Sequence, residues 1–241
     1  MKKIFTTLAF TALALSALTV AAQTQSRDDL LKQISAQRAE LARLEKAFLS
    51  PSEEDLAKYQ EFLRQSDTGL TRLLPRETFD SSSAPDKQAL TIRGGGAFYS
   101  FKERTHEYIN STAIGLEHGY LMTIFGGANY AMLANVGEVP LENISLESSA
   151  TQVLVQHTPA IDEPHARVEQ RRFMDGTTVD GVSYKSRLQL RLNSTYLLRS
   201  VLYDTSDAIV AFKVVRIDND DSAIILWKLL KKYPTPYLAR N

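Results

Sequence analysis

The sequence contains no cysteine among its 241 residues, which excludes every function that depends on a thiol. A disulfide framework, a thiolate nucleophile and a thiolate-bound metal all need sulfur atoms that this chain does not have. A lipid anchor on an N-terminal cysteine is excluded for the same reason. Because secreted domains of eukaryotes often carry disulfides, an exported chain without cysteine is more typical of a bacterium.

The sequence also lacks an excess of charge of either sign. It has 28 basic and 28 acidic residues, so its formal net charge is zero. A neutral protein has no long-range field that would attract nucleic acid or an anionic membrane. We therefore expect no nucleic acid among its partners.

Motifs of common enzymes are missing as well. No Gly-x-Ser-x-Gly sequence occurs, and no two histidines have the four-residue spacing of a zinc-protease helix. A metal site would have to be assembled from separate loops, and its candidate ligands are histidines with a carboxylate nearby in sequence: His106, His118 and His165. The alternative is ordinary hydrogen-bonded loop histidines, and we expect no cofactor.

What the sequence does have is a strongly apolar N-terminus. Lys2 and Lys3 precede an apolar run, Ile4 to Val20, that ends in small residues. This order is typical of a secretory signal peptide over residues 1–22. A retained membrane anchor is the alternative, although the run is just short of a comfortable span of about 20 residues. We expect cleavage, which predicts a periplasmic or secreted protein without a stable membrane anchor.

The next segment, residues 26–49, has a helical pattern. Ser26 and Asp29 form a capping-box pair at its start. Its apolar residues follow a heptad spacing with one polar member: Leu30, Ile34, Gln37, Leu41, Leu44 and Phe48.

A second helix is predicted directly after the first. Ser50 is placed to cap it, Pro51 to occupy its first position and Glu53 to complete a capping box. We therefore expect a helical hairpin arm over residues 25–74. The arm either packs on its own domain or, as a short coiled coil over residues 26–63, mediates self-association or binds a partner protein.

The pattern changes after a polar linker, residues 75–89. From Leu90 onward, apolar residues recur at every second position, with no amphipathic helices between the runs. The expected fold class is therefore α+β: an N-terminal helical hairpin followed by a mainly antiparallel β domain over residues 90–237, either barrel-like or a sandwich.

The segment Ala208–Tyr233 predicts a β-hairpin around the acidic turn Asp218-Asn219-Asp220-Asp221. Pairing Ile217 with Ser222 places Phe212 opposite Trp227, and the face that carries both rings is continuously apolar. We expect that face in the core. Lys213 and Lys228 interrupt the opposite face, which we expect to be covered only in part, by the helical arm. Calcium binding by the turn is the alternative interpretation of its acidic residues, but Asp and Asn also favour turns by themselves.

Two features invite an anion-binding interpretation. The run Arg93-Gly94-Gly95-Gly96 leads into an extended segment and not into a helix, so we interpret it as a flexible strand entry and not as a phosphate loop. Strands predicted at Arg167–Phe173 and Val182–Leu192 would form a second hairpin. Its basic stripe would bind an anionic partner or an envelope polymer, or would simply be solvated; it comprises Arg167, Arg171, Lys185, Arg187 and Arg191.

No motif selects a reaction. The sequence therefore favours a non-enzymatic binding or assembly protein of the cell envelope, with an unknown ligand. The alternative is a periplasmic or secreted hydrolase whose active site is assembled from loops.

Overall fold

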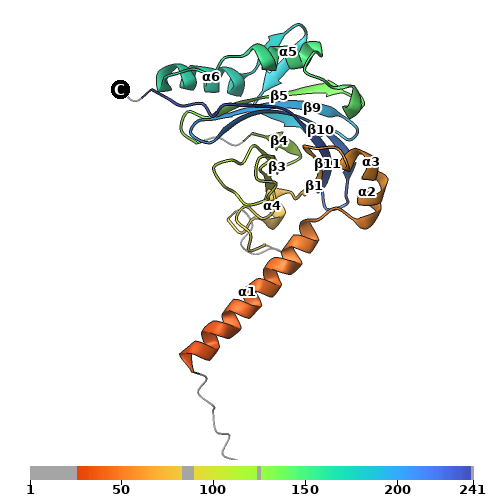
Figure 1. Ribbon diagram of the computed structural model, residues 1–241, viewed down its shortest axis with the longest axis vertical. Helices are drawn as coiled ribbons and strands as arrows, with labels where there is room; N and C mark the ends of the chain where they lie inside the picture. Colours follow the sequence, from red (N-terminus) through yellow and green to blue (C-terminus); the bar gives the residue numbers. More distant parts are fainter. Residues whose placement is uncertain (1–25, 83–89, 124–125, 240–241) are drawn as a thin grey trace, which may run out of the picture. The chain divides into compact units, whose positions relative to one another are not determined.

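The computed structural model describes residues 26–82, 90–123 and 126–239 (Figure 1). The chain divides into two compact units, residues 1–39 and residues 40–241. The predicted signal peptide and residues 83–89 of the predicted linker lie outside the described residues.

The helices and strands are α1 Arg27–Leu49, α2 Glu53–Lys58, α3 Gln60–Leu63, β1 Thr68–Leu73, α4 Arg76–Phe79, β2 Phe98–Tyr99, β3 Ile114–Glu117, β4 Tyr120–Met122, β5 Tyr130–Gly137, the 3-10 helix η1 Leu141–Asn143, α5 Ser149–Gln156, α6 Glu163–Asp175, β6 Thr177–Val179, β7 Val182–Lys185, β8 Arg187–Gln189, β9 Thr195–Leu202, β10 Ser206–Ile217 and β11 Ala223–Tyr233.

Two antiparallel sheets form the second unit. The larger has seven strands in the order β1-β11-β10-β9-β5-β7-β6, and the smaller has four in the order β2-β3-β4-β8. Helices α5 and α6 lie on one side of the large sheet, and β3 and β4 lie on the other (Figure 1). One apolar core fills the space under the helices, and a second core fills the space between the sheets. The predicted α+β class is confirmed, and the β domain is a layered arrangement and not a closed barrel.

The predicted register of the C-terminal hairpin is confirmed in the part nearest the core. Phe212 pairs with Trp227, and both rings are buried between the sheets. A bulge beyond Val214 shifts the end of the ladder by one residue, so Ile217 pairs with Ala223 instead of Ser222. The opposite face packs in part against α3 through Phe62, as expected from the two lysines that interrupt it.

The helical arm is shorter than predicted. Ser26 caps α1 as predicted, because its Oγ accepts from the Asp29 amide and donates to the Asp29 carboxylate, which forms half of the predicted capping box. The cap of α2, however, is Ser52 with Asp55, and not Ser50 with Glu53. Residues 68–73, predicted at the end of the arm, are strand β1 in the large sheet. That prediction was wrong because an edge strand takes its conformation from its neighbour, here β11.

The predicted hairpin with the basic stripe was also wrong. Residues 163–175 form helix α6, whose cap is Asp162 and whose first turn contains a proline. The second predicted strand is divided at Ser186 between two sheets, with β7 in the large sheet and β8 in the small one. Tyr184 therefore packs under the helices, whereas Leu188 packs between the sheets.

Polar side chains attach α5 to the large sheet. Arg199 and Asp207 form a fully buried bidentate ion pair, with Nε–Oδ1 at 2.9 Å and Nη2–Oδ2 at 2.7 Å. The remaining nitrogen of the guanidinium, Nη1, donates to the carbonyls of Leu154 and His157. The charges on this pair are compensated by each other and by carbonyls at the end of α5, which is the arrangement that a buried ion pair requires.

Candidate functional site

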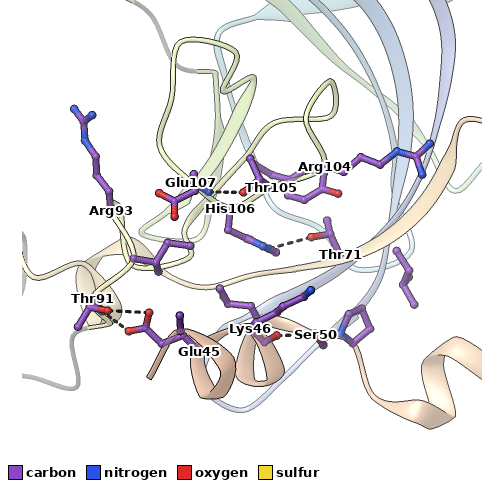
Figure 2. A pocket seen from close by; sticks show the side chains of 16 residues that line it. Glu45, Lys46, Ser50, Thr71, Thr91, Arg93, Arg104, Thr105, His106 and Glu107 are labelled. Carbon is purple, nitrogen blue, oxygen red and sulfur yellow. Dashed lines mark hydrogen bonds between the residues drawn. The ribbon is translucent and has the colours of Figure 1, made fainter. Parts of the chain in front are cut away.

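A cavity of about 760 Å³ lies beside strand β1, and we call it the β1 groove (Figure 2). Its volume is in the range of pockets that hold small ligands or peptide segments. The C-terminal part of α1 forms one wall with Glu45 and Lys46, and the loop that carries His106 forms the facing wall. The chain brings these walls together from segments about 60 residues apart in sequence, so no local motif could have revealed the groove.

The free edge of the large sheet borders this groove. β1 is the outermost strand and pairs only with β11 in the sheet order. The amide of Leu229 donates to the carbonyl of Asp67, which makes these two residues a hydrogen-bonded pair. Hydrogen-bonded and non-bonded pairs alternate along an antiparallel ladder, so Gly69 and Thr71 direct their backbone groups at β11. Leu70 and Arg72 direct theirs away from the sheet.

The backbone of Leu70 has no hydrogen-bond partner within the described residues for its outward N–H and C=O. The outward carbonyl of Arg72 accepts a hydrogen bond from His106 Nε2 at 2.6 Å. The N–H of the next outward residue, Leu74, donates to the carbonyl of Gly96. The edge of β1 is therefore closed at its C-terminal end and open at Leu70.

His106 is held in one orientation. Its Nε2 lies 3.0 Å from the Thr71 hydroxyl in addition to the Arg72 carbonyl, and its ring packs edge-on against Tyr99. Burial lowers the pKa of His106 below its ordinary value. A carbonyl oxygen can only accept, so Nε2 carries the ring proton. It cannot then remove a proton from Thr71, and the two side chains do not form a nucleophile and a general base.

Charged side chains surround the groove without converging on one point. Arg93 and Arg104 extend in opposite directions in Figure 2, and each covers an aromatic ring, Tyr108 at 5.0 Å and Trp227 at 5.3 Å respectively. Lys46 forms no ion pair within the described residues. Two carboxylates line the groove, and only one of them has a partner. Glu45 accepts hydrogen bonds from the backbone and hydroxyl of Thr91. Glu107 has no ion-pair partner in the described part of the chain.

The glycine run directly follows Arg93, which lines the groove. All three glycines have positive φ, between 61° and 87°, which residues with a side chain rarely adopt. A Cβ on Gly95 would lie 2.3 Å from the backbone of Phe79. The run is thus a tight, packed turn and not the flexible strand entry that we predicted. It holds Arg93 at the groove and contains no helix N-terminus to bind phosphate.

The structure places the three candidate metal ligands on separate elements. His118 is in the β3–β4 turn with positive φ, and its Nδ1 lies 3.6 Å from a carboxylate oxygen of Glu77. His165 is in the first turn of α6, and its Nδ1 contacts Asp162. Only His106 lines the β1 groove. No group of three or more His, Cys, Asp or Glu residues able to hold a metal occurs within the described residues.

Sequence reasoning passed over the fourth histidine. His157 Nε2 lies 2.8 Å from the hydroxyl of Tyr130, under α6. Burial, and then the charges of Arg199 and Arg172, lower the pKa of His157 to about 4. The ring is therefore neutral at physiological pH. No nearby carboxylate in the sequence marks this residue, and only the packed core explains its state.

The basic residues of the predicted stripe do not form one face. Arg167 and Arg171 lie on α6, where Arg167 pairs with Glu163. Lys185 is on β7 and Arg187 is on β8, where its guanidinium stacks over Tyr120 at 4.3 Å. Arg191 follows β8. The stripe depended on a hairpin that the fold does not contain.

One carboxylate of the acidic turn in the C-terminal hairpin, that of Asp218, is bound by arginines. Asp218 pairs with Arg72 of β1 and with Arg216 of β10, and Arg216 also pairs with Asp55 of α2. These contacts lower the pKa of Asp218 despite the opposing effect of its burial. Asp218 thus connects the turn to β1, β10 and α2, and its carboxylate is already neutralised by protein groups.

Comparison with family models, with curated proteins and with solved structures finds no match to this chain. Among the described residues, no helix combines the length and the apolar character that crossing a membrane requires. Any functional conclusion therefore comes from the residues of the chain itself.

Proposed function

We propose that the protein is an exported binding or assembly module of the bacterial cell envelope, and that it self-associates through α1. The apolar N-terminus supports export, because its order of basic, apolar and small residues is the one that signal peptidases process. The absence of cysteine supports a bacterial source.

The observation that carries the proposal is the heptad stripe of α1, which we call the α1 seam: Leu30, Ile34, Gln37, Leu41, Leu44 and Phe48. α1 runs without a break from Arg27 to Leu49, so the heptad spacing of the sequence is a stripe on one helix. The five apolar members of the seam are between 40% and 50% exposed: Leu30, Ile34, Leu41, Leu44 and Phe48. A helix with a stripe of this kind is stabilised when a second helix covers it. The uncharged Gln37 within the stripe favours a defined register at some cost in stability.

The state of His106 favours binding over hydrolysis. Two histidines and a carboxylate within hydrogen-bond reach in one pocket would have supported a hydrolase. The β1 groove has one histidine, and its Nε2 proton is donated to a backbone carbonyl. This geometry supports a groove that recognises a ligand without transforming it.

Light scattering of the purified protein tests the self-association. We expect a mass of at least two chains at micromolar concentration. The double substitution Ile34→Lys and Leu41→Lys places two charges in the seam and should give a monomer. The matched control, Ser35→Lys and Ala39→Lys, adds the same charges at exposed positions outside the seam and should leave the mass unchanged. A monomeric wild-type protein, or equal masses for the two variants, would exclude the proposal.

A further inference from the structure

We propose that the β1 groove binds an extended peptide of a partner protein, which adds a short strand to the open edge of β1. Strand addition is a common mode of peptide recognition, in which main-chain hydrogen bonds supply affinity and flanking side chains supply specificity. This inference concerns a different surface from the α1 seam, and it holds whether or not the protein self-associates.

The backbone of Leu70 is the central observation. Its N–H and C=O point away from β11 and form no hydrogen bond within the described residues, although Leu70 and Thr71 line the cavity. An unpaired strand edge is a template for another strand, and proteins usually cover or blunt such edges. Here the edge faces a cavity of about 760 Å³ that is large enough for a peptide backbone and its side chains.

His106 limits the length of the added strand. Its hydrogen bond occupies the outward carbonyl of Arg72, so the added strand cannot extend past this point. The outward positions left on β1 are Thr68, Leu70 and the amide of Arg72. At about 3.4 Å per residue, they accommodate a segment of roughly three to five residues. A short segment with one main-chain anchor at Leu70 fits the groove.

The charges along the groove indicate the chemistry of the peptide. Lys46 has no ion pair within the described residues, and Arg104 forms an ion pair with Asp67 only at the long distance of 4.0 Å. Arg93, like Lys46, pairs with no carboxylate in the described part of the chain. Of the two carboxylates that line the groove, Glu45 is already hydrogen-bonded to Thr91, so Glu107 alone, without an ion-pair partner in the described part of the chain, stands against the three cations Lys46, Arg93 and Arg104. The groove therefore favours a peptide with acidic side chains.

A single small anion fits these observations less well. The two arginines that line the groove point in opposite directions (Figure 2), so they cannot both contact one compact group. An extended chain meets separated charges with separated side chains and also satisfies the backbone of Leu70. Only an extended peptide contacts both the separated charges and the unpaired backbone of Leu70.

Selection from a displayed library of random linear peptides, with the purified protein as bait, provides the probe. We expect enriched peptides to alternate β-branched residues with Asp or Glu. Leu70→Pro removes the outward N–H, and proline is tolerated on an edge strand where that N–H faces away from the sheet. This variant should bind the enriched peptides at least about tenfold more weakly, since it loses a main-chain hydrogen bond and introduces a clash. The matched control, Leu70→Val, keeps the N–H and should bind within about threefold of the wild type.

A second measurement does not depend on the folding of a variant. The best enriched peptide is synthesised with N-methyl groups at alternate residues in two complementary sets. One set should abolish binding and the other should leave it intact, because only every second N–H of an added strand faces β1. The absence of any enriched peptide, equal binding by the wild type and Leu70→Pro, or equal effects of the two methylated sets would overturn the proposal. The seam variant Ile34→Lys and Leu41→Lys should bind the peptide normally, so the two proposals can fail independently.

Discussion

Gly69 lies directly opposite Trp227 in the ladder between β1 and β11, and the indole fills the space that a side chain at residue 69 would need. A Cβ on Gly69 would be 2.4 Å from Trp227 Cζ2. The guanidinium of Arg104 lies over the same ring at 5.3 Å. Strand β1, which borders the groove, thus packs closely against the side chain of Trp227 on β11 because residue 69 is glycine.

Gly69→Ala should therefore destabilise the protein. Overpacking of this kind costs about 1–3 kcal/mol of unfolding free energy. Urea unfolding followed by the fluorescence of Trp227, the single tryptophan of the chain, measures this change. Gly126→Ala is the matched control, because its Cβ meets no atom within 4 Å, and it should change stability by less than about 0.5 kcal/mol. Equal effects of the two substitutions would contradict the close approach.

Asp207→Asn should be more damaging than any exposed carboxyl-to-amide change. It leaves the guanidinium of Arg199 buried without its counter-charge, and breaking a buried pair in this way costs about 3–5 kcal/mol. Glu61→Gln is the control, because its pair with Arg64 is largely exposed and such pairs contribute at most about 1 kcal/mol. The measurement is the free energy of unfolding in urea. A loss for Asp207→Asn no larger than that for Glu61→Gln would show that the buried pair is dispensable.

Stability should fall as the pH is lowered through the range of histidine titration. The pKa of His157 is about 4 in the folded protein and about 6.5 in an unfolded chain. Between these values the unfolded state binds more protons, so the free energy of unfolding decreases as the pH falls. From about pH 7.5 to about pH 5 the expected loss is about 2 kcal/mol.

The variant His157→Gln separates this contribution from the others. It cannot titrate, so its stability should decrease less over the same pH interval. A smaller decrease of the same sign should remain, because burial also lowers the pKa of His106. The same pH dependence in the variant as in the wild type would assign the effect to other groups.

Gly95→Ala should destabilise the protein more than Gly119→Ala. Both glycines have positive φ, 61° and 71°, so both substitutions introduce comparable backbone strain. Only at Gly95 does the added Cβ also meet backbone atoms, those of Phe79 at 2.3 Å. The difference between the two melting temperatures therefore reports the close packing of the glycine turn. No difference would mean that the turn tolerates a side chain.

Local rules predicted the centre of the C-terminal hairpin but not helix α6, although both have signals contained in a short segment. The pairing of Phe212 with Trp227 follows from one turn and two alternating strands, and this pair is present in the ladder between β10 and β11. Helix α6 also had local signals, since Asp162 caps it and Gly176 ends it. Its buried face is small, with only Ala166 and Phe173 fully covered, so the helical period was weak and the segment was interpreted as a strand.

Other elements were decided by partners distant in sequence. In the sequence alone, Gly69 resembles a glycine that ends a helix. In the structure, residue 69 is glycine because the indole of Trp227 on β11 occupies the space that a side chain would need. The strand predicted over residues 182–192 changes sheets at Ser186, whose backbone pairs with Phe173 and Thr123. Neither partner is visible from the local pattern.

The sequence by itself determined the chemistry that is excluded, the α+β class and the central register of the C-terminal hairpin. These properties depend on composition, or on contacts between residues close together in the chain, where loop closure costs little entropy. Only the tertiary structure decided the β1 groove, the orientation of His106 and the neutral state of His157. Each depends on which distant segments exclude water from a given side chain, and burial of that kind is set by packing and not by local pattern.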